Sequence, residues 1–276
     1  MIKKITSIFC LVILITLILT LIASGRFLKS YKESNMNHSS KMAINVIQSN
    51  YDSAITGLSG SVRSLSAAFE VDPNKPFDEA LILSNIQDIV KANKAYNNVI
   101  LANLSGEAFT VAAKGWEKDF NAITGNREWF TSIIQDKKDS NISNPYKSIL
   151  GIYEMTASAP LMFNNKVVGV LALDVNLNTL IPDSGVEFAL TTQSGQIVAI
   201  DSSSPVDFLN QNLFEIRPNF KDVADSPMFI DAGNDEYFSL TKLPLSHGVI
   251  GYIFTNQTIT FGNAQDIQTT LISVLI

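Results

Sequence analysis

The sequence predicts an α+β protein in which one long N-terminal helix precedes two tandem antiparallel-sheet units, with a membrane-spanning helix at each end of the chain. Three observations predict this fold class. Residues 5–25 form an uncharged apolar run, residues 44–69 carry apolar side chains at helical spacing, and a strand–Ser-Gly–strand phrase occurs twice.

The apolar run at residues 5–25 is long enough to cross a bilayer, because a helix needs roughly 20 apolar residues to span about 30 Å of hydrocarbon. Two lysines precede the run, so the positive-inside rule assigns residues 1–4 to the cytoplasm and residues 26–71 to the other side of the membrane. The alternative is a signal peptide cut near residues 23–25, although the apolar region of such a peptide is usually about 7–15 residues long.

The other end of the chain, residues 267–276, is again apolar and follows the last acidic residue, Asp266. We expect it to be the start of a second transmembrane helix that is cut short, with a cytoplasmic signalling module beyond it. A buried C-terminal strand is the alternative, because a short apolar run does not separate the two interpretations.

The segment 26–71 is predicted to be one long amphipathic helix. A helix that packs along one side only shows this pattern of apolar residues every three or four positions, with polar residues between them. The Asp72–Pro76 segment should end it, since proline lacks an amide donor. The apolar face packs against its own domain or, near the membrane, forms the seam of a homodimer. The face comprises Ile44, Ile47, Tyr51, Ile55, Leu58, Val62, Leu65 and Phe69.

Two sheet units follow, at residues 72–180 and 181–264. The first begins with a short amphipathic helix through residues 80–90, and both contain hairpins in which apolar strands flank a Ser-Gly or Asn-Asn turn. The repeated pattern predicts two copies of one α/β sandwich. The expected hairpins are 98–111 and 157–175 in the first unit, and 188–198 and 236–255 in the second.

Composition excludes several functions. The net charge of −6 and the lack of a Lys/Arg cluster argue against a nucleic-acid partner, which requires a basic face. The single cysteine, Cys10, lies in the predicted membrane helix, so we expect neither a disulfide framework nor a thiolate metal site. We expect no metal, no cofactor and no catalytic residues, because the chain contains no nucleophile elbow, His-Glu-x-x-His pair or phosphate loop.

Groups suited to a small anionic or zwitterionic ligand are concentrated between residues 125 and 174. Arginine offers a planar fork for a carboxylate, tryptophan and tyrosine offer polar atoms on flat apolar walls, and an aspartate in an apolar strand needs a cation. The alternative is a purely structural role, in which Arg127 pairs with Asp174 and the aromatic residues belong to the core. The candidate ligand-binding residues are Arg127, Trp129, Phe130, Tyr146, Ser148, Thr156 and Asp174.

These segments resemble the membrane-distal module of double-Cache sensor domains, which are tandem PAS-like units. The resemblance rests on R-x-W-F at residues 127–130, P-Y at 145–146 and G-V-x-x-x-D at 169–174, and it extends over the whole region between the membrane segments. Such domains are the periplasmic sensors of methyl-accepting chemotaxis proteins, and of some sensor kinases and diguanylate cyclases. The resemblance therefore implies a receptor in the bacterial inner membrane with its sensor region in the periplasm.

In the amino-acid-binding branch of that family, the Arg and Trp of R-x-W bind the ligand carboxylate, and the strand Asp binds the ammonium. The resemblance transfers these roles to Arg127, Trp129 and Asp174, with Phe130 and Tyr146 lining the pocket. Two departures matter: Phe130 replaces the usual Tyr, and Ser148 stands where a second carboxylate is often found. A missing hydrogen bond to a buried ammonium costs on the order of 1–3 kcal/mol, so an organic acid remains an alternative ligand.

Other classes of protein are weaker alternatives. An anchored hydrolase would need a triad such as Ser158, His247 and an aspartate, for which the spacing gives no support. Four aspartates of the second unit, at 201, 207, 222 and 225, are better explained as solvated surface than as a metal site.

Overall fold

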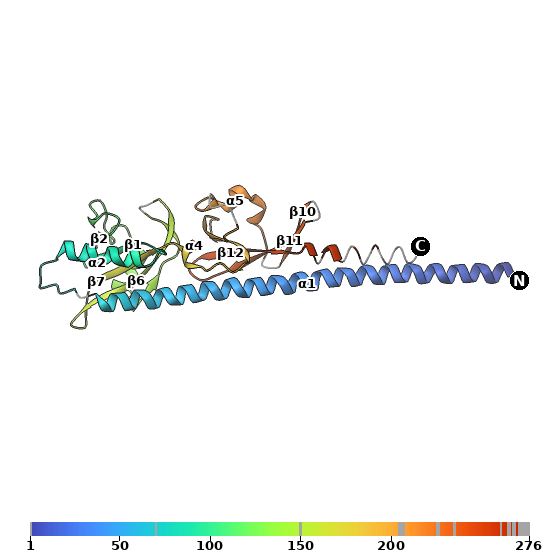
Figure 1. Ribbon diagram of the computed structural model, residues 1–276, viewed down its shortest axis with the longest axis horizontal. Helices are drawn as coiled ribbons and strands as arrows, with labels where there is room; N and C mark the ends of the chain where they lie inside the picture. The colour runs from blue at the N-terminus through green and yellow to red at the C-terminus, as the bar shows by residue number, and fades with distance from the viewer. Residues whose placement is uncertain are drawn as a thin grey trace. The chain divides into compact units, whose positions relative to one another are not determined.

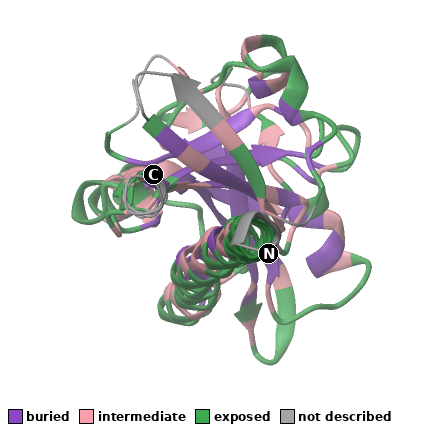
Figure 2. Ribbon diagram, turned by 90° about the vertical axis from the view of Figure 1, so that its right-hand side faces the viewer, coloured by how far each residue is buried: buried purple, intermediate pink, exposed green. Residues whose placement is uncertain are grey.

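The first element of the computed structural model is a single continuous helix, α1 (Ile2–Ala68), which contains both the apolar N-terminal run and the predicted long amphipathic helix (Figure 1). The large apolar side chains of its first turns are exposed, and Figure 2 shows this part of the helix mostly in the colour of exposed residues. Among the residues that the structure describes, α1 is long and apolar enough to cross a membrane. The described residues are 2–69, 71–148, 151–203, 208–224, 227–233, 236–259, 261–263, 266 and 269.

The second half of α1 buries the predicted apolar face against its own chain. Ile47, Tyr51, Leu58 and Val62 are at most 2% exposed. A hydrogen bond also joins this face of α1 to the rest of the chain, because the Tyr51 hydroxyl donates to the Ser246 carbonyl at 2.9 Å. Burial raises the pKa of Tyr51 to about 12. This stretch of the apolar stripe is therefore used within the chain, and a dimer seam made by the membrane-near part stays a prediction.

The helix ends at Ala68, a little before the Asp72–Pro76 segment that was expected to stop it. Helix α2 (Glu79–Ala92) confirms the short helix predicted at residues 80–90. Its N-cap is Asp78, whose side chain accepts a hydrogen bond from the Leu81 amide at 3.1 Å. Capping of this kind satisfies one of the free amides of the first turn.

A seven-stranded antiparallel sheet contains both hairpins predicted for the first unit. Its strand order is β3-β2-β1-β7-β6-β4, with β5 paired to β6. The long strands β1, β6 and β7 form the middle of the sheet, and the strands that the sequence did not indicate are two-residue edge segments. The bounds are β1 (Tyr96–Asn103), β2 (Ala108–Thr110), β3 (Gly115–Trp116), β4 (Asn141–Ile142), β5 (Tyr146–Lys147), β6 (Tyr153–Phe163) and β7 (Lys166–Val175).

Strand β7 is buried from Gly169 to Val175, as expected for the apolar run of a central strand, whereas Lys166 and Val167 at its start are exposed. It enters the sheet through a two-residue turn at Asn164 and Asn165, both of which have positive φ. Gly169 is required by close packing, because a Cβ there would lie 2.5 Å from the carbonyl oxygen of Ala102 on β1. The register pairs Thr156 of β6 and Asn98 of β1 with Asp174 of β7.

Helix α3 (Glu128–Ile134) packs against this sheet and was not predicted as a helix. Trp129, Phe130 and Ile133 are each at most 2% exposed and form one core cluster with small residues of β1, β2 and β7. Its N-cap is Arg127, in extended conformation and without a side-chain cap. The helix thus fixes the R-x-W-F segment on the face of the sheet.

The second sheet has five antiparallel strands in the order β10-β11-β12-β8-β9, which confirms the two hairpins predicted for the second unit. Short helical turns connect the strands. His247 lies in the turn before β12, with a φ of 56°. The bounds are α4 (Leu177–Leu180), β8 (Glu187–Thr192), β9 (Ile197–Ile200), α5 (Leu213–Ile216), η2 (Pro218–Phe220), β10 (Met228–Gly233), β11 (Glu236–Pro244) and β12 (Val249–Asn256).

Contacts between residues divide the chain into two compact units. One contains residues 1–44, 223–242 and 253–276, and the other contains 45–222 and 243–252. The domain boundary expected between residues 180 and 181 stays a prediction. The predicted second membrane helix, 267–276, lies outside the described residues except for Thr269.

Candidate ligand-binding site

A small cavity opens beside the face of the seven-stranded sheet that α3 covers. Its volume is about 20 Å³. That is about the space of one water molecule, whereas ligand pockets usually measure about 300–1,000 Å³, so a ligand requires side chains to move. The cavity is lined by Asn98, Ile100, Ala108, Thr110, Glu117, Phe120, Arg127, Trp129, Tyr146, Ser148 and Asp174.

Asp174 is the buried polar centre of this cavity, with 3% of its surface exposed. The hydroxyl of Thr156 donates to its Oδ1 at 2.7 Å, and the Asn98 amide donates to its Oδ2 at 3.2 Å. The Tyr146 hydroxyl lies 3.4 Å from Oδ1 and 2.7 Å from the Thr156 hydroxyl. Strand pairing creates this cluster, because Asn98 and Thr156 are the register partners of Asp174.

Burial and, as a smaller cause, the nearby charge of Glu154 together raise the pKa of Asp174 to about 7, although three hydrogen bonds act to lower it. Burial also raises the pKa of Tyr146 far above its usual value, with Asp174 as the second cause. A carboxyl group without a compensating cation takes up a proton more readily when it is removed from water. The site is therefore poised to accept a positive charge.

Arg127 approaches the cavity from the N-cap of α3. Its guanidinium carbon lies 5.4 Å from the ring centre of Phe120 and 5.3 Å from that of Tyr146. Its Nε is buried and has no hydrogen-bond partner. Within the described part of the chain, no salt bridge joins Arg127 to Asp174. The alternative in which these two residues form an internal ion pair therefore does not describe this structure.

The two aromatic residues of R-x-W-F have different positions. Trp129 lines the cavity and also belongs to the core, where its ring meets the Phe130 ring edge-to-face at 5.9 Å. Phe130 is a core residue and is not part of the cavity wall. Thr156 is fully buried behind Asp174 and reaches the site through its hydroxyl.

Ser148 lines the cavity and also hydrogen-bonds the carboxylate of Glu154, which lowers the pKa of that group. Burial has the larger, opposite effect and raises the pKa of Glu154. The Asn97 amide donates to Glu154 Oε2 at 2.9 Å. Glu154 is 1% exposed, so a second carboxylate is buried close to Asp174.

The sequence did not single out Asn98, Thr110, Glu117 and Phe120 as site residues. Asn98 was identifiable in principle, because an amide inside an apolar strand needs partners: it donates to Asp174 and accepts from the Ala112 amide at 3.1 Å. Glu117 accepts from the Thr110 hydroxyl at 2.9 Å. Glu117 and Phe120 lie in an irregular segment where no periodicity marks the inward-facing positions.

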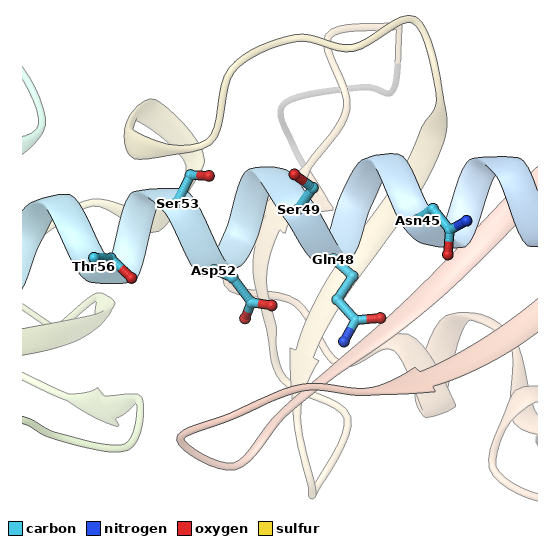
Figure 3. A pocket seen from close by; sticks show the side chains of 6 residues that line it. All are labelled: Asn45, Gln48, Ser49, Asp52, Ser53 and Thr56. Atoms are coloured by element: carbon cyan, nitrogen blue, oxygen red, sulfur yellow. The ribbon is translucent and has the colours of Figure 1, made fainter.

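A second hollow and the residues of the alternative hydrolase triad are weaker candidates for a functional site. Figure 3 shows a hollow along α1 whose six polar side chains come from one face of that helix, and all six are exposed: Asn45, Gln48, Ser49, Asp52, Ser53 and Thr56. The residues of the alternative hydrolase triad are not joined, because His247 Nδ1 bonds the Ser246 hydroxyl at 2.9 Å and the buried Ser158 hydroxyl has no partner. Among the described residues, no group of three His, Cys, Asp or Glu side chains could hold a metal ion.

The structure has one long helix followed by two antiparallel sheets, with a small cavity beside the first sheet. Residues 77–182 match the family described as methyl-accepting chemotaxis protein-like, first PDC sensor domain. This match agrees with the resemblance of the segment to double-Cache sensors of methyl-accepting chemotaxis proteins.

Solved structures with the same fold are sensor domains of chemoreceptors. The sensory domain of the Campylobacter jejuni chemoreceptor Tlp3 with isoleucine bound is 18% identical and has a TM-score of 0.57, over 85% of this chain and 97% of that one. The ligand-binding domain of the Pseudomonas aeruginosa amino acid chemoreceptor PctC, in complex with GABA, is 20% identical and has a TM-score of 0.54, over 80% and 98%. The Pseudomonas fluorescens chemoreceptor CtaA with L-serine is 15% identical and has a TM-score of 0.57, over 82% and 98%.

The curated relatives are not described as chemoreceptors. The toxin coregulated pilus biosynthesis protein I of two Vibrio cholerae strains is 27% identical over 247 residues, which cover 88% of this chain. The chain spans 38% of the length of these relatives.

Proposed function

We propose that this chain is the extracytoplasmic sensor region of a transmembrane receptor, and that it binds a small carboxylate-bearing molecule, with an amino acid favoured, in the cavity beside Asp174. The main support for this proposal is that two buried charged groups at one cavity lack a compensating charge. Arg127 has a buried Nε without a partner, and Asp174 is buried without a cation among the described residues. A zwitterion satisfies both, because buried charges require compensation.

The proposed geometry divides the ligand between two ends of the cavity. Arg127 and the Trp129 indole receive the carboxylate, and Asp174 receives the ammonium. Tyr146 bridges the two ends, because its ring faces the guanidinium and its hydroxyl contacts the Asp174 cluster. The relatives with isoleucine, GABA and L-serine support an amino-acid ligand by analogy of fold.

Signalling follows from the small size of the cavity. A ligand binds only when side chains around about 20 Å³ of free space rearrange. A ligand that binds the rearranged site more tightly than the ligand-free arrangement shifts the receptor population toward the rearranged one. We place the movement at α3 and β7, which carry Trp129 and Asp174, and its transmission through α1 to the membrane is part of the same proposal.

The location and the partners belong to this proposal as well. The apolar N-terminal part of α1 supports an anchor in the bacterial inner membrane, with the sheets in the periplasm. The greater length of the Vibrio cholerae relatives supports a further module of the protein, for which a chemoreceptor signalling module is favoured over a histidine kinase or a diguanylate cyclase. We propose a homodimer and no enzymatic activity.

The proposal is tested by calorimetric titration of the full chain in detergent with the twenty L-amino acids and a set of short organic acids. We expect at least one to bind the wild type, and Arg127→Ala to abolish that binding while the circular dichroism spectrum is unchanged. Arg63→Ala, on the exposed face of α1, is the matched control and should bind as the wild type does. Unchanged binding by Arg127→Ala would overturn the assignment.

A further inference from the structure

The carboxylate of Glu154 is buried, and the proposed contacts of the ligand with Arg127, Trp129 and Asp174 do not use it. We infer that Glu154 supplies the second carboxylate of the ligand-binding site, so that the cavity selects ligands with a protonated amino group by holding it between Glu154 and Asp174. This inference rests on the proposed function and names the chemical class that the site prefers.

Strand geometry places Glu154 next to Asp174, although Glu154 itself is not part of the cavity wall. Glu154 lies two residues before Thr156 on β6, and alternate residues of a strand face the same side of the sheet. Thr156 is the register partner of Asp174 on β7, so Glu154 is the diagonal neighbour of Asp174, within reach of a side-chain contact. On the other side of β6, Glu154 pairs with Tyr146 of β5, whose hydroxyl contacts Asp174.

One oxygen of Glu154 remains free for a ligand. Its Oε2 accepts from Asn97 at 2.9 Å, whereas Oε1 is buried and has no hydrogen-bond partner. A buried carboxylate oxygen without a donor is costly, and native proteins rarely keep one without a function. Ser148 connects this group to the cavity, because it lines the wall and hydrogen-bonds the Glu154 carboxylate.

The local charge balance explains why an ammonium fits. Neither Glu154 nor Asp174 forms a salt bridge with a lysine or arginine in the described part of the chain. Two buried carboxylates close together cannot both be ionised cheaply without a countercharge. An ammonium group has three donors and one positive charge, which matches the free Oε1 and the Asp174 carboxylate.

This arrangement accounts for the departure at position 148. The resemblance to amino-acid-binding double-Cache sensors leads us to expect a carboxylate at the position of Ser148. Ser148, which directly follows β5, instead hydrogen-bonds the Glu154 carboxylate, so the second negative charge comes from β6. The end of the site that binds the ammonium group would therefore have two carboxylates, as the resemblance leads us to expect.

The test compares pairs of ligands that differ only in the amino group: an L-amino acid that binds the wild type, and the carboxylic acid of the same carbon skeleton with hydrogen in place of the amine. Calorimetric titration of the full chain in detergent should show that Glu154→Gln weakens binding of the amino acid at least tenfold. The affinity for the acid without the amine should be unchanged or higher. Glu107→Gln removes the same charge at an exposed position outside the cavity and should change neither affinity.

A structural role predicts a different pattern. Loss of affinity for both ligands by the same factor, or for neither, would overturn the inference. The melting temperature of ligand-free Glu154→Gln should equal or exceed that of the wild type, because the substitution removes a buried charge. In the double variant Glu154→Gln/Ser148→Asp, amino-acid affinity should recover, and a double variant that binds no better than Glu154→Gln counts against the idea. If the wild type binds neither ligand, the proposed function itself has failed.

Discussion

The stability of the ligand-free protein should fall as the pH rises from 5 to 8, because of Asp174. Burial raises the pKa of this group from 3.8 to about 7, so the folded state binds a proton that the unfolded state has already lost in this range. Stability decreases with pH wherever the folded state binds more protons. The two pKa values differ by about three pH units, of which about two lie above pH 5, and one unit corresponds to about 1.4 kcal/mol. The free energy of unfolding should therefore fall by up to about 3 kcal/mol between pH 5 and pH 8. Glu154, whose pKa is also raised, acts in the same direction.

The measurement is urea unfolding of the full chain in mild detergent at pH 5, 6, 7 and 8. Tryptophan fluorescence follows the unfolding, because Trp129 is 1% exposed and Trp116 is 37% exposed in the folded state. Asp174→Asn should be more stable than the wild type at pH 8 and should show a shallower decline with pH. Asp119→Asn, on an exposed loop, serves as the matched control and should follow the wild-type curve.

Two outcomes would refute this reasoning. A wild type whose stability is constant or rises from pH 5 to pH 8 would show that the Asp174 carboxyl is not held in an unfavourable environment. An Asp174→Asn variant with the full wild-type decline would assign the pH dependence to other groups. Addition of a bound amino acid should flatten the decline, because its ammonium stabilises the ionised form of Asp174.

Two further predictions concern the sheet that carries the site. Gly169→Ala should destabilise the protein by about 1–3 kcal/mol in urea unfolding, since the new Cβ would lie 2.5 Å from a carbonyl oxygen; Gly57→Ala on α1, where nothing lies within 4 Å, should be neutral or stabilising, and equal effects would contradict the packing argument. Asn165→Gly should raise stability by up to about 1 kcal/mol, because both turn residues have positive φ and Asn-Gly is the preferred pair for such a hairpin. A loss of stability in Asn165→Gly would mean that the Asn165 side chain itself supports the turn.

Local patterns in the sequence were sufficient for the elements of the fold. The spacing of apolar residues predicted α1 and α2, and apolar runs around Ser-Gly and Asn-Asn turns predicted three hairpins. The repeat of the pattern predicted the fourth hairpin, β11–β12. The two-residue strands β3, β4 and β5 were not predicted, because their conformation depends on pairing with a longer strand and not on their own residues. Helix α3 was missed for a similar reason, since its seven residues are too few to show a clear helical period.

For the site, the sequence by itself determined which residue types were available: an arginine, a tryptophan, a tyrosine and an aspartate in segments of recognisable order. Only the tertiary structure decided that Arg127 does not pair with Asp174, that Phe130 belongs to the core, and that Glu154 is buried beside Asp174. The physical reason is that local periodicity depends on neighbours within a few residues. Burial, hydrogen bonding and charge compensation depend on which strands pair, and that pairing joins residues far apart in the chain.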